Sequence, residues 1–256
     1  MKLRDLVAAM ESLAPPSLAE PWDNVGLLVG DPDQDLTHAL LTIDATPAVI
    51  DEAAALGCEL ILAYHPVIFE GLKRVTAGSR AWTLLRRGIA VYSPHTALDV
   101  AEGGTNDVLA DVVGLLHRRP IRVTRPETGM GLGRIGAIAP TERAELLDRI
   151  RAGLGVARLL VAGPTEGAVS RVAVGAGACG DLLGDVLAAG AGLYLTGEMR
   201  HHDALRAADA GVTVVCALHS NSERVTLDRL AARLGGLVTG VRFTRSQRDR
   251  DPFEVR

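Results

Sequence analysis

Histidines and carboxylates gather in four short segments of this 256-residue chain. The segments are Tyr64-His65-Pro66, His95-x-x-x-Asp99, Thr196-Gly197-Glu198-x-x-His201-His202 and His219-x-x-x-Glu223. Imidazole nitrogens and carboxylate oxygens are donors that proteins offer to divalent transition-metal ions. The four segments therefore predict a metal site, and with it an enzyme rather than a bare scaffold.

Each of the four segments lies at or just after a short apolar run that predicts a β-strand. These runs span residues 60–63, 89–92, 193–195 and 212–217. In an open α/β sheet, the residues just past the carboxyl ends of the strands gather at one edge, where ligands bind. We therefore expect the histidines and carboxylates of the four segments to converge.

Every one of these segments also has a purely structural interpretation. His65 can be a hydrogen-bonded histidine at a strand end, and Asp99 can cap the following helix. Glu223 is favourable near a helix N-terminus for electrostatic reasons alone, and Glu198 fits a capping box. Since adjacent histidines point in different directions on a helix, we favour His201 over its neighbour for a supporting or proton-transfer role. The prediction depends on all four segments together.

Composition argues against several classes of partner. Hydrophobic residues make up 48% of the chain and charged residues 23%, as is usual for a soluble globular protein. Aromatic residues make up only 3%, which leaves few side chains to stack on nucleic-acid bases. The net charge of −4 creates no overall attraction to DNA or to anionic membranes. Nucleic acid and membrane are therefore not expected as partners.

The three cysteines and the apolar runs predict a cytoplasmic protein. Cys58, Cys179 and Cys216 are far apart and form no C-x-x-C pair, which fits a reducing compartment. The N-terminal pattern is that of an amphipathic helix rather than a signal peptide. No apolar run approaches the roughly 20 residues that span a bilayer.

Common nucleotide-binding and hydrolase motifs are missing from the sequence. It contains neither G-x-x-x-x-G-K-[ST] nor G-x-S-x-G. Residues 175–180 match the spacing G-x-G-x-x-G after a predicted strand. The acidic residue that a dinucleotide site needs at a strand end about 20 residues later is absent. A tight strand-to-helix turn is the default interpretation of this glycine motif.

Predicted strands alternate with predicted helices along the whole chain. This rhythm predicts an α/β protein with mixed sheets that are flanked by helices. Around residues 118–130 the composition becomes polar and rich in turn residues. We therefore predict two α/β domains, residues 1–122 and 123–256.

Together these segments resemble the NGG1-interacting-factor-3-like family, whose members are often named GTP cyclohydrolase 1 type 2 homologues. The resemblance runs nearly from end to end. It is carried by residues 22–30 (WDNVGLLVG), 64–69 (YHPVIF), 95–99 (HTALD) with 104–107 (GTND), 196–198 (TGE) with 201–202 (HH), and 219–223 (HSNSE). It implies a metal site in a cleft between the two domains and a ring-shaped homohexamer built from dimers.

The resemblance also implies a ligand set. By position, His65, Asp99 and Glu223 hold one ion, and His219 shares Glu223 with a second ion. Family members usually carry two histidines before the proline, but here the first is Tyr64. A neutral phenol with a pKa near ~10 is a poor ligand unless the metal lowers that pKa. One or two ions are therefore expected, with Tyr64, a water molecule or His95 as the compensating group.

Three functions remain open at this point. The first is a metal-dependent hydrolase, in which a metal-activated water attacks a nucleotide-like or related small substrate. Glu198 or His201 would then move protons, and Tyr64 would orient the substrate. The second is a non-catalytic metal-binding or regulatory protein. The third is a nucleic-acid-binding ring that uses a local arginine patch such as Arg118-Arg119-x-x-Arg122-x-x-Arg125. The mixed ligand set suits iron, zinc, manganese, cobalt or nickel.

Overall fold

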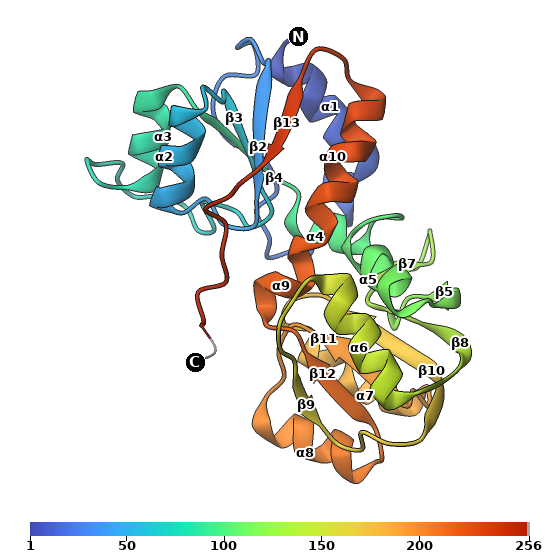
Figure 1. Cartoon of the computed structure of the whole chain (residues 1–256). Coiled ribbons are helices and arrows are strands. Elements are labelled where there is room, and N and C mark those ends of the chain that lie inside the picture. The colour runs from blue at the N-terminus through green and yellow to red at the C-terminus, as the bar shows by residue number, and fades with distance from the viewer. Residues whose placement is uncertain (255–256) are drawn as a thin grey trace. The chain divides into compact units, whose positions relative to one another are not determined.

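The computed structural model describes residues 1–254, and the chain forms two compact units (Figure 1). Unit 1 contains Met1–Glu102 and Leu227–Arg250. Unit 2 contains Gly103–Thr226 and the chain end from Asp251. Unit 1 is thus built from two stretches of chain, and nearly all of unit 2 is inserted between them.

Unit 1 is built on a five-stranded mixed sheet with the strand order β1-β4-β3-β2-β13. Strand β1 is antiparallel to β4, and all other neighbouring pairs are parallel. The strands are β1 (Gly26–Val29), β2 (His38–Thr42), β3 (Leu60–Ala63), β4 (Ala90–Ser93) and β13 (Arg242–Arg245). The three central strands are buried along their whole length, as expected when helices cover both faces.

Helices cover this sheet on both faces (Figure 1). They are α1 (Leu3–Leu13), the 3-10 helix η1 (Pro16–Leu18), α2 (Pro47–Ala55), α3 (Arg80–Arg87), α4 (His95–Val100) and α10 (Thr226–Leu237). Val49 of α2 and Leu84 of α3 pack in one core cluster with Ile61 of β3. Helix α2 starts where the Thr46 side chain accepts from the Val49 backbone, and α3 ends at Gly88, whose φ is +65°.

Unit 2 is built on a six-stranded mixed sheet with the order β5-β8-β10-β11-β12-β9. Strands β10, β11 and β12 are parallel, and the other three pair antiparallel with their neighbours. The strands are β5 (Leu116–Arg119), β8 (Arg134–Glu142), β9 (Leu160–Ala162), β10 (Ala168–Gly175), β11 (Leu193–Thr196) and β12 (Thr213–Cys216). A separate hairpin consists of β6 (Arg122–Arg125) and β7 (Met130–Leu132).

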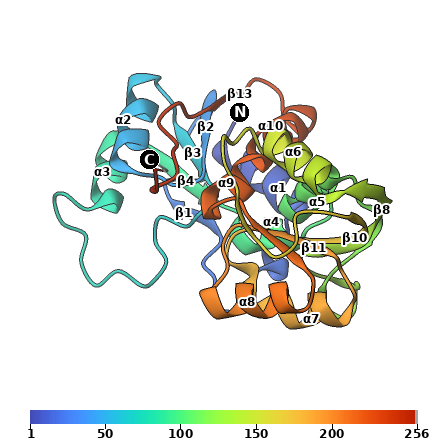
Figure 2. The same ribbon diagram turned by 60° about the horizontal axis from the view of Figure 1, so that its bottom comes forward.

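The sheet of unit 2 has a core on each face. Val172 and Val174 of β10 pack in one core cluster, whereas Ala173 between them packs in the other, because side chains alternate along a strand. Helices α7 and α8 lie next to each other (Figure 2). The helices of this unit are α5 (Thr105–Val113), α6 (Arg143–Leu154), the 3-10 helix η2 (Cys179–Leu182), α7 (Leu183–Ala188), α8 (His201–Asp209) and α9 (His219–Arg224).

The predicted α/β architecture, with mixed sheets flanked by helices, is confirmed. The division of the chain differs from the predicted boundary at residue 122. The polar stretch at 118–130 contains the β6–β7 hairpin, and the last helix and strand belong to unit 1. Strand β13 pairs with β2 through Phe243 and Ala39, about 200 residues apart in sequence. Local composition carries no signal for such a long-range pairing.

The last part of the described chain contains two helices and a strand. Helix α9 ends at Arg224, α10 continues to Leu237, and β13 begins at Arg242. No helix in the described part of the chain combines the length and apolar character needed to cross a bilayer.

Candidate metal centre

Three aromatic rings meet at the carboxyl ends of β3 and β4 in unit 1. Strands β3 and β4 are parallel neighbours, so their ends lie side by side. Tyr64 and His65 directly follow β3, and His95 begins α4 after β4. The ring centres lie 5.3 Å apart for His65 and His95, 5.5 Å for Tyr64 and His65, and 6.0 Å for Tyr64 and His95. Two of the four predicted segments therefore converge within this unit.

Each of these two histidines is held by a carboxylate. Nδ1 of His65 lies 3.0 Å from Oδ1 of Asp44, and Nδ1 of His95 lies 2.7 Å from Oδ1 of Asp23. A carboxylate only accepts hydrogen bonds, so Nδ1 donates and Nε2 is the acceptor nitrogen of each neutral ring. Asp44 and Asp23 were not among the predicted site residues. The sequence signal of Asp44 is its place just after β2, and Asp23 lies in the 22–30 segment that carries the family resemblance.

Both carboxylate oxygens of Asp23 accept hydrogen bonds. Its side chain is fully buried, and Oδ2 accepts hydrogen bonds from the backbone and the hydroxyl of Thr96. Burial raises the pKa of the Asp23 carboxyl, but the hydrogen bonds from His95 and Thr96 outweigh it and hold that pKa below its ordinary value of 3.8. Asp23 therefore stays ionised at neutral pH and keeps accepting from His95.

The phenol of Tyr64 donates a hydrogen bond to Oδ1 of Asp99. Tyr64 is fully buried, and Asp99 belongs to α4. His95 and Asp99 both belong to this helix, and because they are four positions apart they lie on the same face of it. The following helix α5 has Gly104 at its N-cap, so Asp99 does not serve that helix as a cap. The structural interpretation of Asp99 as a capping residue is therefore wrong.

The second group of site residues belongs to unit 2 and consists of Glu198, His219 and Glu223. Glu198 follows β11, and the other two residues lie four apart on α9. Nδ1 of His219 lies 3.0 Å from Oε1 of Glu198, and Nε2 lies 3.2 Å from Oε1 of Glu223. Glu223 is buried, with 3% of its surface exposed. His219 is thus a third histidine whose Nδ1 lies beside a carboxylate, and its Nε2 lies beside a second one.

The backbone around Gly177 fixes this group in place. Oγ of Ser222 accepts from the Gly177 backbone at 2.9 Å and donates to the His219 carbonyl at 2.7 Å. A Cβ atom on Gly177 would lie 2.7 Å from Oε1 of Glu223 and 3.2 Å from Nε2 of His219. The glycine motif at 175–180 therefore makes room for the imidazole and the carboxylate. Leu218, just before His219, has φ +70° and ψ 152°, a strained conformation that is almost exclusive to glycine.

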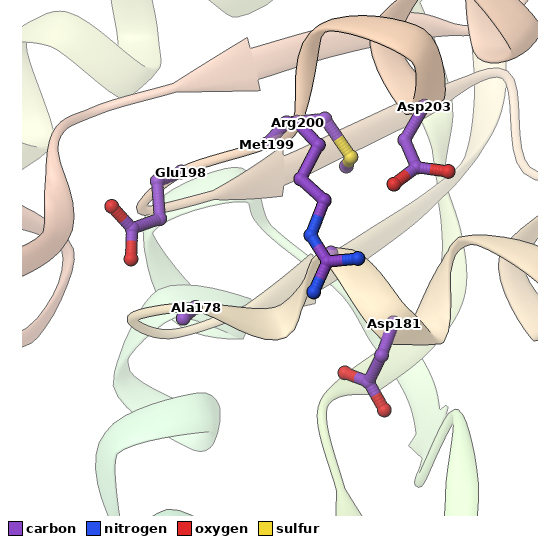
Figure 3. A pocket seen from close by; sticks show the side chains of 7 residues that line it. Ala178, Asp181, Glu198, Met199, Arg200 and Asp203 are labelled. Atoms are coloured by element: carbon purple, nitrogen blue, oxygen red, sulfur yellow. The ribbon is translucent and has the colours of Figure 1, made fainter.

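A cavity of about 430 Å³ lies beside Glu198 in unit 2 (Figure 3). Its lining includes Met199, Arg200, Asp181 and Asp203. Pockets for small molecules usually have volumes of roughly 300–1,000 Å³, so this cavity has room for a small ligand. Glu198 both lines the cavity and accepts the hydrogen bond from His219.

His201 does not join the group around Glu198. It is the first residue of α8, it is exposed, and its ring centre lies 5.2 Å from that of His202. Within residues 1–254, no hydrogen bond or ion pair joins His201 to Glu198 or His219. The proton-transfer role of His201 stays a prediction.

Comparison with known proteins identifies the family. The family model described as Duf34/NIF3 (NGG1p interacting factor 3) matches residues 1–252. A Clostridium perfringens protein named GTP cyclohydrolase 1 type 2 homolog is 32% identical over 265 residues, which cover 99% of each chain. The Drosophila melanogaster NIF3-like protein 1 is 38% identical over 235 residues, which cover 87% of this chain and 78% of that protein.

Solved structures share the fold. A Bacillus cereus protein related to NIF3 superimposes with a TM-score of 0.91 at 23% identity, covering 100% of this chain and 99% of the other. The resemblance inferred from the sequence segments is confirmed by the family model and by the relatives of 30% identity or more. This chain belongs to the Duf34/NIF3 (NGG1p interacting factor 3) family.

Proposed function

We propose that this chain is a metal-dependent hydrolase that holds one or two divalent transition-metal ions through His65, Asp99, His219 and Glu223. The observation that carries the proposal is the repeated pairing of a histidine Nδ1 with a carboxylate, at His65, His95 and His219. A histidine that binds a metal through one nitrogen almost always donates from the other to a carboxylate, a carbonyl or water. Such pairs fix the tautomer and direct Nε2 toward the metal.

The donor set fits such an ion. His65, His219 and Glu223 each offer one ligand atom, and the mixture of nitrogen and oxygen donors suits iron, zinc, manganese, cobalt or nickel. A cation beside Glu223 would stabilise the charge of this buried carboxylate. The absence of a side chain on Gly177 leaves space beside the two ligand atoms of unit 2.

We assign separate roles in the reaction to the metal, Glu198 and Tyr64. When bound, the metal acts as a Lewis acid and lowers the pKa of water toward about 7. Glu198 uses one oxygen to orient His219, and its carboxylate can also accept a proton at the wall of the cavity. Tyr64 holds Asp99 through its hydroxyl. Since relatives are named GTP cyclohydrolase 1 type 2 homolog, we propose a nucleotide-like or related small molecule as the substrate.

The substitution Glu223→Gln tests this proposal. It keeps the shape of the side chain but removes the charge, so we expect metal affinity to fall at least about 100-fold, as expected when a charged ligand is lost. Bound metal is measured by elemental analysis after dialysis, and hydrolysis is measured against a nucleotide panel. Glu166→Gln, at an exposed loop position, is the matched control and should change neither value.

Two results would contradict the proposal. Equal metal binding by the Glu223→Gln and Glu166→Gln variants would remove Glu223 from the ligand set. Metal binding by the wild-type protein with no turnover above the Glu223→Gln background would instead identify a non-catalytic metal-binding protein.

Two of the four arginines in the patch at 118–125 are paired with protein carboxylates. Arg118 forms an ion pair of 2.6 Å with Asp111, and Arg122 forms one of 2.8 Å with Asp181. These two pairs reduce the positive charge that the patch offers to a nucleic acid. The homohexamer, the cytoplasmic location and the identity of the metal stay predictions.

A further inference from the structure

His95 is not a glycine, yet its backbone has a strained conformation with a positive φ angle. Its φ is +30°, a value that few non-glycine residues adopt. Such a conformation persists only where the surroundings enforce it, and it is often found at functional sites. The positive φ angle of His95 must therefore be stabilised by contacts with neighbouring residues.

Asp23 holds His95 in this conformation. Its Oδ1 holds Nδ1 of His95 at 2.7 Å, and its Oδ2 holds the backbone of the next residue, Thr96, at 3.1 Å. One fully buried carboxylate thus fixes both the ring and the backbone that carries it. The outcome is that Nε2 of His95 is the acceptor nitrogen of a ring that cannot easily turn.

The neighbours of this ring are groups of the proposed metal site. The His65 ring lies perpendicular to it, with an interplanar angle of 89° and a centre distance of 5.3 Å. Two imidazoles bound at about 2.0–2.1 Å to one tetrahedral ion have ring centres roughly 5 Å apart. The spacing of His65 and His95 is therefore compatible with a shared ion.

We propose that His95 is itself a metal ligand through Nε2, and that Asp23 is its positioning residue. This inference rests on the proposed function, because it adds a ligand to the same site. It also assigns Tyr64 a different role. The phenol donates to Asp99, so it keeps its proton and holds that carboxylate instead of binding the ion. His95 thereby supplies the imidazole that position 64 lacks.

The test compares full-length variants by zinc content after dialysis, by chelator competition and by the visible spectrum of bound Co²⁺. We expect His95→Ala to weaken binding of one ion at least about 100-fold and Asp23→Asn to weaken it about 10–100-fold, as for other carboxylates that orient a metal-binding histidine. Tyr64→Phe removes only the hydrogen bond to Asp99, so it should weaken binding less than His95→Ala does. His202→Ala removes an exposed histidine and is the control.

The His95→Gln variant guards against loss of folding, since its amide can still donate to Asp23 but is a poor ligand. We expect it to lose the same ion, with an unchanged circular dichroism spectrum. The inference is overturned if His95→Ala and His95→Gln bind metal as His202→Ala does, or if Tyr64→Phe loses an ion that they keep. If the wild-type protein binds no divalent ion, the proposed function itself fails, and this inference fails with it.

Discussion

At the scale of single residues, the proposed chemistry depends on which nitrogen of each histidine carries the proton. A neutral imidazole has two tautomers, and only an acceptor nitrogen can bind a metal. His219 has a carboxylate beside each ring nitrogen, Glu198 at Nδ1 and Glu223 at Nε2. Asp44 and Asp23 settle the choice for His65 and His95 by accepting from Nδ1. The same carboxylates increase the basicity of the opposite nitrogen.

The substitution Gly177→Ala is predicted to disturb the unit 2 ligands directly. Its Cβ would lie 2.7 Å from Oε1 of Glu223, and its φ of +61° already disfavours a side chain. We expect a loss of about 1–3 kcal/mol in the free energy of unfolding, measured by urea denaturation. We also expect weaker zinc binding, measured by chelator competition.

Gly190→Ala is the matched control for that change. Gly190 has a similar φ of +70°, but a Cβ there meets nothing within 4 Å. It should therefore cost some stability through backbone strain while leaving zinc affinity unchanged. If both variants lose zinc equally, backbone strain rather than the contact with Glu223 explains the effect.

At the scale of elements, three adjacent parallel strands deliver three site residues to the same edge of the unit 1 sheet. Thr42 at the end of β2 pairs with Ala63 at the end of β3, and β3 and β4 are likewise in register. Asp44, His65 and His95 follow these three strands within two residues. If the register of any of these strands shifted by one residue, the site residue that follows the strand would point away from this edge of the sheet.

Glu59 stabilises the other end of the same strands, and its effect should depend on pH. Burial raises the pKa of its carboxyl, but hydrogen bonds from Thr37 and His38 outweigh it and lower that pKa below 4.5. Its stabilisation is therefore present above about pH 4.5 and is lost as the pH falls through the lower folded pKa.

We expect Glu59→Gln to destabilise the protein by about 1 kcal/mol or less at pH 7, because solvent screens this partly exposed carboxylate. The difference from the wild-type protein should shrink as the pH falls from about 5 to 3, as measured by urea denaturation at each pH. A difference that is constant across this range would show that the charge of Glu59 does not matter.

The sequence predicts the strands that carry the site better than it predicts the partners of the site residues. The strands before His65 and His95 are apolar and buried, so a short hydrophobic run is enough to locate them. Asp23 lies in a segment that carries the family resemblance, but its role could not be assigned because that role depends on a contact 72 positions away. The same limit explains why β13 was not assigned to the first sheet.

At the scale of the whole molecule, unit 1 is completed only by the last part of the chain. Helix α10 contributes the buried side chains Leu227, Leu230 and Leu234, and β13 covers the edge of β2. A chain that ends at residue 226 would lack all of these contacts. We expect fast hydrogen exchange across β2 in this truncated chain and slow exchange across β10 to β12, whose partners are all retained. Equal protection of β2 in both chains would contradict this prediction.

The insertion of unit 2 also sets an order of events on the ribosome. The first 102 residues emerge early, but the outer neighbour of β2 is synthesised some 200 residues later. During that interval the β2 edge of the nascent sheet has unpaired backbone amide and carbonyl groups, which can form hydrogen bonds with strands of other chains. The intervening segment can acquire its own core first. Slow translation of the final codons would therefore prolong the period in which this protein is most prone to aggregate.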